Sequence, residues 1–152
     1  MNAKNPLRAL IVYDSIGGRS EATAKAVADE LQTEGYHVTL KSVHVSEPEE
    51  VKDYHLLVVG TWVYQWLFMQ FPSREILHFV ANLPSLEGKQ AAVFATHLFN
   101  ADHVVSKLEE ALSDRQAEIV ALHQVKAYAP HAGAKAFAQM LAGRYTHSPS
   151  GL

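Results

Sequence analysis

The sequence predicts an α/β fold in three layers, with helices on both faces of a five-stranded parallel sheet. Short apolar runs of strand length alternate with longer stretches in which apolar residues recur every three or four positions. Most of the short runs are continuously apolar, as in strands that helices cover on both faces. The chain has 152 residues and no internal repeat or linker. We therefore expect one domain, with a core over about residues 7–143 and a flexible tail over residues 144–152.

Each strand follows from its apolar pattern. The second strand alternates apolar with polar residues and is expected to be less buried than the others. In chain order the five strands are expected at Leu7–Tyr13, Tyr36–Val43, Leu56–Gly60, Ala91–Thr96 and Ile119–Val125.

The stretches between the strands have helical periodicity and are expected to cover the sheet. Gly35 ends the first helix, and Pro72 suits the first turn of the second. A polar connection precedes the third strand and has room for one helical turn. The four helices are expected at Glu21–Glu34, from Pro72 to Leu83, around Val104–Leu112 and around Ala134–Leu141, and the polar connection at Glu47–Asp53.

Three loops are candidates for a binding site, because parallel α/β sheets bind ligands beyond the carboxyl ends of their strands. These loops follow the first, third and fourth strands. They comprise Asp14–Ser20, Thr61–Phe71 and Thr96–Asp102.

The first loop is suited to an anion. It joins a strand to a helix N-terminus, where free N–H groups carry partial positive charge. Its candidate residues are Ser15, Ile16, Gly17, Gly18, Arg19 and Ser20. Two hydroxyls can donate, two glycines allow positive φ and close approach, and Arg19 can pair with phosphate, whereas Asp14 must point away. The alternative is an ordinary turn with Ser20 as the helix cap.

The second loop is rich in aromatic residues, although loops are usually polar. An aromatic loop at the ligand end of a sheet is expected to cover something, and a flat conjugated ring gains from offset stacking. The candidate residues are Thr61, Trp62, Val63, Tyr64 and Trp66. The alternative is that the aromatic side chains fill the core or an interface, which is the better interpretation for Phe68 and Phe71.

The third loop gives a weaker indication. Its candidate residues are Thr96, His97, Phe99 and Asn100. His97 and Phe99 could flank a ring, and Asn100 could hydrogen-bond its edge. Equally, Asn100 or Asp102 could cap the next helix.

The composition excludes several classes of function. A net charge of −3 with scattered basic residues argues against nucleic acid binding. No apolar run approaches the roughly 18 residues of a membrane span, and residues 1–8 lack a signal-peptide core, so we expect a cytoplasmic protein. Without cysteine there are no disulfides or thiolate sites, and the nine histidines lack ligand spacing, so no metal site is expected.

The candidate loops resemble those of flavodoxins. Ser15, Gly18 and Ser20 match the phosphate pattern of that family, Thr/Ser-x-Thr/Ser-Gly-x-Thr/Ser. The run Leu56–Tyr64 resembles the third strand and the ring-binding loop, and the similarity extends over roughly residues 7–125. The resemblance implies the flavodoxin-like fold with strand order 2-1-3-4-5 and FMN as the bound redox group.

The chain also departs from that pattern in three respects. Gly17 replaces a hydroxyl residue of the phosphate loop, and Arg19 is expected to compensate by charge. The third loop lacks the usual Gly and Asp near the flavin edge. Typical electron-carrying flavodoxins are strongly acidic, which steers them to basic partners, whereas this chain is nearly balanced.

The resulting hypothesis is an FMN-binding redox protein that exchanges electrons with a partner protein of unknown identity. Two alternatives stay open at this point. One is an oxidoreductase, an FMN-dependent NAD(P)H:quinone-type reductase. The other is a flavin-free interaction module. No catalytic residue is assigned in any of them, and the sequence does not fix the oligomeric state.

Overall fold

The central sheet of the computed structural model has five strands, all paired in parallel. The structure describes residues 6–15, 18–66, 69–97, 100–126 and 129–146. The sheet strands are β1 (Arg8–Tyr13), β2 (His37–Ser42), β3 (Leu56–Trp62), β6 (Gln90–His97) and β7 (Glu118–Lys126). Their order is β2-β1-β3-β6-β7. Counted along the chain this is 2-1-3-4-5, so the predicted fold class and strand order are confirmed.

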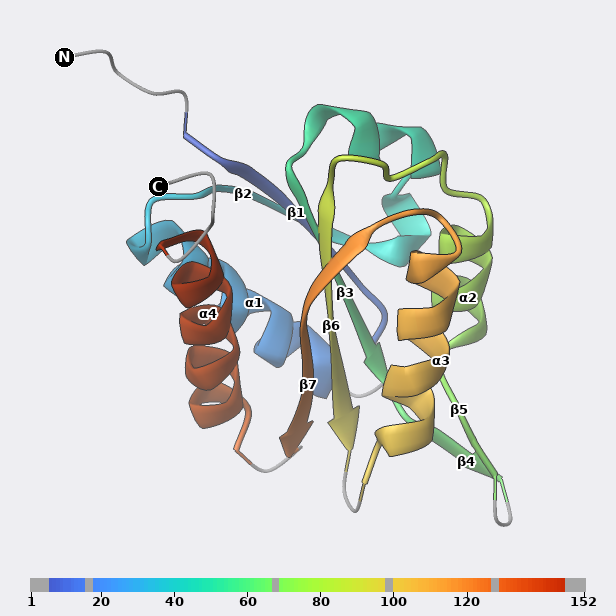
Figure 1. The fold of residues 1–152 in the computed structure, drawn as a ribbon. Helices are drawn as coiled ribbons and strands as arrows, with labels where there is room; N and C mark the ends of the chain where they lie inside the picture. The colour runs from blue at the N-terminus through green and yellow to red at the C-terminus, as the bar shows by residue number, and fades with distance from the viewer. Residues whose placement is uncertain (1–5, 16–17, 67–68, 98–99, 127–128, 147–152) are drawn as a thin grey trace, which may run out of the picture.

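Helices cover both faces of this sheet (Figure 1). On one face lie α1 (Arg19–Thr33) and α4 (Pro130–Thr146), and on the other α2 (Arg74–Ala81) and α3 (Asp102–Ser113). Successive strand residues point to opposite faces, so Ile11 joins the core under α1 and α4, and Leu10 the core under α2 and α3. Because both faces are covered, β1 is apolar at every interior position.

The helix boundaries correct two details of the sequence analysis. Gly18, with φ 81°, caps α1, so Ser20 lies inside the first turn and is not the cap. Pro72 precedes α2, whose cap is Ser73; the Ser73 hydroxyl accepts the N–H of Ile76 at 3.2 Å. Both caps end a loop at the carboxyl edge of the sheet, and they therefore set where the two helices begin relative to that edge.

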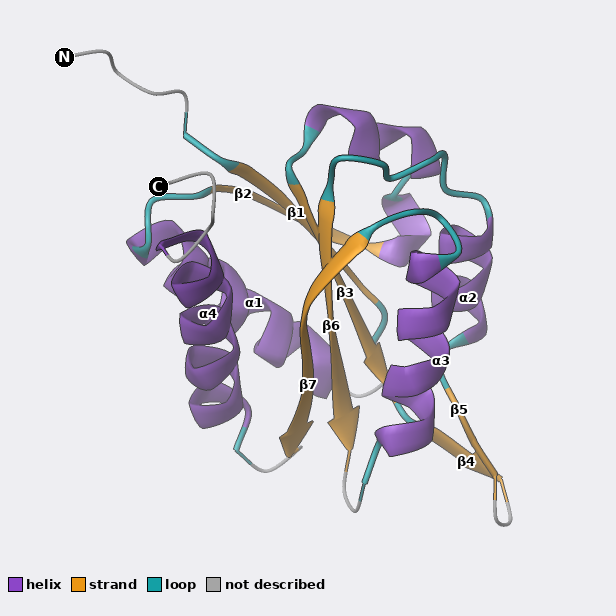
Figure 2. Ribbon diagram, viewed as in Figure 1, coloured by secondary structure: helices purple, strands orange, loops and turns teal. Residues whose placement is uncertain are grey.

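The second loop contains a hairpin that the sequence analysis did not predict. Its strands β4 (Tyr64–Trp66) and β5 (Met69–Phe71) pair with each other in antiparallel register and form a separate sheet. The hairpin extends beyond the carboxyl end of the main sheet (Figure 2). It therefore enlarges the edge at which a ligand is expected.

The remaining connections agree more closely with the expected elements. Two 3-10 helices, η1 (Val43–Val45) and η2 (Pro48–Asp53), join β2 to β3, and η2 lies in the predicted polar connection. Helix α4 extends to Thr146 and so includes the first residues of the predicted tail. Among the helices within the described ranges, none has the length and apolar character that a membrane crossing requires.

Gly60 marks a close approach in the middle of the sheet. It lies opposite Phe94 on β6, and a Cβ atom at Gly60 would lie 2.1 Å from the Cζ atom of that ring. Phe94 is fully buried and packs edge-on against Phe137 of α4. The glycine therefore leaves room for the ring that links β6 to α4.

Candidate functional site

The three candidate loops lie next to one another because β1, β3 and β6 are adjacent in the sheet (Figure 1). Backbone hydrogen bonds connect neighbouring strand ends near these loops. The N–H of Asp14 donates to the carbonyl of Gly60 at 3.0 Å, and the N–H of Val63 donates to the carbonyl of Thr96 at 3.2 Å. A ligand at this edge would contact residues from all three loops.

The first loop presents a helix N-terminus to this edge. The side chain of Ser15 accepts the N–H of Glu21 at 3.2 Å, so it fastens the loop to the first turn of α1. Gly18 is exposed and has positive φ, as predicted for a glycine of this loop. Arg19 is exposed, and no residue in the described part of the chain forms an ion pair with it. The predictions for Ile16 and Gly17 fall outside the described residues.

Asp14 is buried at the start of the first loop, and its carboxylate bonds to neighbouring groups of the protein. It is 6% exposed, and its carboxylate accepts the N–H of Ser15 at 2.9 Å and the hydroxyl of Ser73. The Oδ1 atom of Asp14, which accepts the N–H of Ser15, also lies 3.2 Å from Nε2 of His44. Ser73 in turn donates its N–H to the hydroxyl of Thr61 at 3.0 Å. This network connects the first loop to the second through the cap of α2.

The sequence analysis missed this network because its members are far apart in the chain. Asp14 and Ser73 are separated by 59 positions, and neither belongs to a motif with the other. Ser73 alone carried a usable signal, since a serine just before an apolar helical repeat is typical of a helix cap.

The second loop brings two aromatic rings together at the strand end. The centroids of Trp62 and Tyr64 are 3.6 Å apart, with 45° between the ring planes. Trp62 is half-buried and Tyr64 is 45% exposed. Thr61 is fully buried, and its hydroxyl bonds within the protein to Ser73 and to the carbonyl of Trp62. Trp66 belongs to β4, and its side chain lies outside the described structure.

The third loop is fastened to the hairpin. The side-chain amide of Gln70 donates to the backbone carbonyl and to Oδ1 of Asn100, at 3.1 and 3.2 Å. The cap of α3 is Ala101, whose N–H donates to Oε1 of Gln124 at 2.9 Å. Neither Asn100 nor Asp102 is therefore the helix cap. The prediction for Phe99 falls outside the described residues.

Several buried polar atoms at this edge lack a partner in the described part of the structure. Each lies in the first turn after β1 or at the end of β3 or β6. They are Oγ of Ser20, Nε1 of Trp62, Oγ1 of Thr96 and Nδ1 of His97. Buried polar groups are nearly always hydrogen-bonded, and an unpaired one costs about 1–3 kcal/mol. A further unpaired atom, Oε1 of Gln90, lies at the opposite end of β6, whereas the four at the carboxyl edge offer donors and acceptors that suit a polar ligand.

The surroundings of His97 favour the neutral form of its imidazole. Burial lowers the pKa of this imidazole, the charge of Lys126 lowers it further, and Asp102 offsets part of the effect. The side chain is 9% exposed. A neutral imidazole can donate from one nitrogen and accept at the other, so it suits the polar rim of an uncharged ring.

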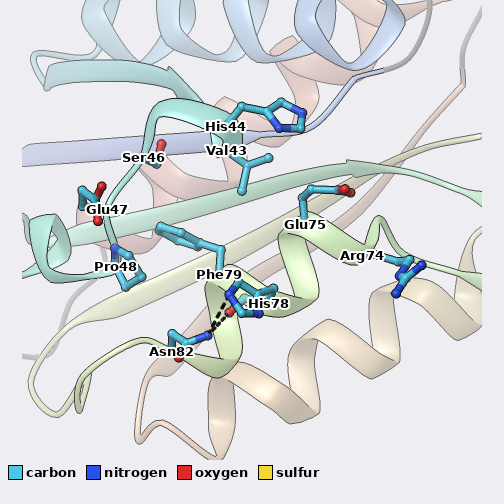
Figure 3. A pocket seen from close by; sticks show the side chains of 10 residues that line it. All are labelled: Val43, His44, Ser46, Glu47, Pro48, Arg74, Glu75, His78, Phe79 and Asn82. Atoms are coloured by element: carbon cyan, nitrogen blue, oxygen red, sulfur yellow. Dashed lines mark hydrogen bonds between the residues drawn. The ribbon is translucent and has the colours of Figure 1, made fainter.

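A pocket of about 740 Å³ is lined by residues outside the three candidate loops (Figure 3). It is bounded by η1, the start of η2 and α2. The lining residues are Val43, His44, Ser46, Glu47, Pro48, Arg74, Glu75, His78, Phe79 and Asn82. None of them belongs to the candidate loops, so we do not assign this pocket to the ligand predicted at the strand ends.

A comparison with known protein families identifies the family of this chain. The family model described as Flavodoxin matches residues 11–152. The chain belongs to the flavodoxin family. Flavodoxins are electron-transfer proteins whose cofactor is FMN. No curated protein sequence matches the chain.

Solved structures, flavodoxins among them, share the fold at low sequence identity. A two-electron reduced flavodoxin of Megasphaera elsdenii is 17% identical, with a TM-score of 0.77 over 89% of this chain and 98% of that one. Flavodoxin 2 of Bacillus cereus is 24% identical, with a TM-score of 0.76 over 90% and 99%. Rubredoxin oxygen:oxidoreductase of Desulfovibrio gigas is 20% identical, with a TM-score of 0.76 over 94% of this chain and 37% of that one.

The geometry fits the cofactor of the flavodoxin family. FMN combines a phosphate, a polar chain and a flat ring with polar edges. The first loop offers the N-terminus of α1 and the Ser20 hydroxyl, and the ends of β3 and β6 offer aromatic surface with unpaired polar atoms. The groups of the first loop thus suit the phosphate of FMN, and those at the ends of β3 and β6 suit its ring.

Proposed function

We propose that this flavodoxin holds FMN across its three loops and exchanges electrons with a partner protein. Bound FMN supplies the redox chemistry, and the protein supplies binding, orientation and burial. The unpaired buried polar atoms at the carboxyl edge of the sheet carry this proposal. For the binding residues we retain those expected from the sequence, at the ends of β1, β3 and β6.

The phosphate end is assigned to the loop before α1. Its proposed donors are the backbone N–H groups of Arg19 and Ser20 at the start of α1, the hydroxyl of Ser20 and the guanidinium of Arg19. Ser15 has a supporting role in this loop, because its side chain already accepts the N–H of Glu21.

The ring end is assigned to the second and third loops. Trp62 and Tyr64 provide aromatic surface, and the unpaired groups of Thr96 and His97 suit the polar edge of the ring. Gln70 and Asn100 connect these two loops, so they support the ring site without having to contact it.

The test compares FMN with riboflavin in a Ser20→Ala variant. A hydrogen bond to a charged group is worth about 1.5–3 kcal/mol, so FMN affinity should fall roughly ten- to hundred-fold. Riboflavin lacks the phosphate and should be affected much less. Dissociation constants from flavin fluorescence titration measure both effects.

The control separates binding from folding. Ser20 is fully buried with an unpaired hydroxyl, so its replacement by alanine should not lower the thermal stability of the flavin-free protein. Ser113→Ala, at the exposed end of α3, should change neither affinity nor stability. Equal losses for FMN and riboflavin in Ser20→Ala would contradict the phosphate assignment.

A further inference from the structure

One residue, Val63, joins the main sheet to the hairpin. β3 ends at Trp62 and β4 begins at Tyr64, so these two aromatic residues flank Val63 in the chain (Figure 2). Their ring centroids are 3.6 Å apart. The orientation of the peptide group between Trp62 and Val63 therefore affects where both rings lie.

Both polar groups of the Trp62–Val63 peptide are hydrogen-bonded. The N–H of Val63 donates to the carbonyl of Thr96 on β6 at 3.2 Å. The carbonyl of Trp62 accepts the hydroxyl of Thr61 at 3.0 Å. In addition, Val63 packs against the core under α2 and α3. A planar peptide group that is bonded at its N–H and at its C=O cannot turn without losing a hydrogen bond, so its orientation is fixed.

The hydroxyl that holds this carbonyl is itself held by a second element. Oγ1 of Thr61 accepts the N–H of Ser73 at 3.0 Å. Ser73 is the cap of α2, and its own hydroxyl accepts the N–H of Ile76 at 3.2 Å. Both Thr61 and Ser73 are fully buried. The side chain of Thr61 therefore connects the end of β3 to the start of α2.

These bonds leave the Thr61 hydroxyl with no hydrogen to donate to a ligand. A hydroxyl has one hydrogen, and Thr61 uses it on the carbonyl of Trp62. By contrast, Nε1 of Trp62 is buried without a partner in the described part of the structure. Thr61 is thus suited to hold the backbone, whereas Trp62 is suited to contact a ligand.

We propose that Thr61 is a positioning residue of the ring site, whose hydroxyl fixes the Trp62–Val63 peptide and thereby places the rings of Trp62 and Tyr64 against the flavin. This inference rests on the proposed function, since it takes these two rings as the surface that receives the flavin. It gives Thr61 a role that acts through Trp62, in place of a hydrogen bond to the ligand.

The experiment compares Thr61→Val and Thr61→Ser with the unmodified protein. Valine nearly keeps the shape of threonine but lacks the hydroxyl, whereas serine keeps the hydroxyl. Thr61→Val should weaken binding of FMN and riboflavin alike, by about two- to tenfold, the range expected for one hydrogen bond. It should also restore part of the fluorescence of the bound flavin, and Thr61→Ser should reverse both effects. Fluorescence titration with each flavin measures them.

Thr39→Val is the matched control, because it removes a bonded threonine hydroxyl at another place. The Thr39 hydroxyl, on β2, accepts the hydroxyl of Tyr54 at 2.9 Å. Both valine variants should lower the thermal stability of the flavin-free protein, because each loses a hydrogen bond. Only Thr61→Val should change the affinity for flavin and the fluorescence of the bound flavin.

Amide hydrogen exchange tests the same peptide without a substitution. In the flavin-free unmodified protein, the amide of Val63 should exchange slowly, because it is bonded before any flavin arrives. Rapid exchange at Val63 would overturn the inference, and this measurement remains decisive if Thr61→Val does not fold.

The outcomes distinguish this inference from the proposed function. A loss of stability in Thr61→Val with unchanged flavin affinity and fluorescence would overturn the positioning role alone. A loss of affinity confined to FMN would do the same, because the effect would then lie at the phosphate. Failure of the unmodified protein to bind either flavin would overturn the proposed function together with this inference. Equal losses for both flavins, with rescue by Thr61→Ser, support both.

Discussion

At the scale of single residues, Trp62 and Tyr64 are the side chains on which the ring assignment depends. A stacked aromatic residue quenches flavin fluorescence and contributes about 0.5–1.5 kcal/mol beyond its buried area. Replacing either residue by alanine should therefore weaken flavin binding roughly two- to tenfold and restore part of the fluorescence of the bound flavin. Both quantities come from one fluorescence titration.

The matched control is Tyr54→Ala. This tyrosine lies before β3, at the opposite end of the sheet, where its ring is covered by the guanidinium of Arg8. Its loss should leave flavin fluorescence unchanged. If the variants at Trp62 and Tyr64 behave like Tyr54→Ala, these rings belong to the hairpin packing and not to a flavin site.

His97 gives a second prediction for a single residue, in the pH dependence of stability. Because burial and Lys126 lower the pKa of His97 in the folded protein, the unfolded chain binds more protons than the native one just below the usual histidine pKa of about 6.5. The free energy of unfolding then rises with pH in this range. The contribution of neutral His97 to stability is fully present above the usual histidine pKa, and it is lost as the pH falls below that value.

Thermal unfolding between pH 7.5 and pH 5 measures this effect. His97→Gln should lose less stability on acidification than the unmodified protein. His103→Gln, exposed at the start of α3, should keep the full dependence. Part of the dependence should persist in His97→Gln, because burial also lowers the pKa of His123. Identical slopes for His97→Gln and the unmodified protein would show that His97 is not responsible.

At the scale of elements, the contact between β3 and β6 depends on the missing side chain of Gly60. A methyl group at this position would overlap the Phe94 ring, since the built Cβ lies 2.1–2.7 Å from three ring carbons. Overpacking of a core typically costs about 1–3 kcal/mol. Gly60→Ala should therefore lower the free energy of unfolding by about this amount in chemical denaturation.

A double mutant tests whether Phe94 is the cause. Phe94→Leu alone loses ring contacts with Phe137, but it should make room for the new methyl group. The double variant Gly60→Ala/Phe94→Leu should then be less destabilised than the sum of the two single variants. Additive effects would mean that the methyl group is accommodated in another way.

Elements also differ in how far the sequence predicts them. The five sheet strands could be predicted because continuous apolar runs are typical of strands covered on both faces. The β4–β5 hairpin could not, because its turn has neither Gly nor an Asn-Gly pair to mark it. The three loops follow from topology, whereas the contact of Asp14 with Ser73 and His44 depends on packing between distant segments. Sequence patterns thus predict which loops lie at the candidate site. They do not predict the contacts that hold these loops in place.

At the scale of the whole molecule, the question is whether the bound flavin serves a partner protein or a small substrate. The described part of the chain is a single sheet with its helices and one hairpin. Members of the flavodoxin family, to which the chain belongs, transfer electrons to redox partners. The proposed function therefore predicts that the flavin serves a partner protein.

Steady-state oxidation of NADH and NADPH by the FMN-loaded protein measures the difference. With quinone, azo-dye and ferric acceptors, turnover should stay below about 1 s⁻¹, the lower end of the usual enzymatic range. A known FMN-dependent quinone reductase at equal flavin concentration provides the positive control. Faster turnover with any acceptor would favour the reductase alternative.

The β4–β5 hairpin has a consequence for engineering. Its two strands pair only with each other within the described structure, and none of their backbone pairings belongs to the main sheet. Since strand side chains alternate with a period of two, the ribbon could be lengthened or shortened by two residues per strand while its inward and outward faces are kept. Such variants would change how far the hairpin extends beyond the carboxyl end of the main sheet, and they would leave the five-stranded sheet unchanged. The hairpin is thus a suitable place to graft a new recognition segment next to the proposed cofactor site.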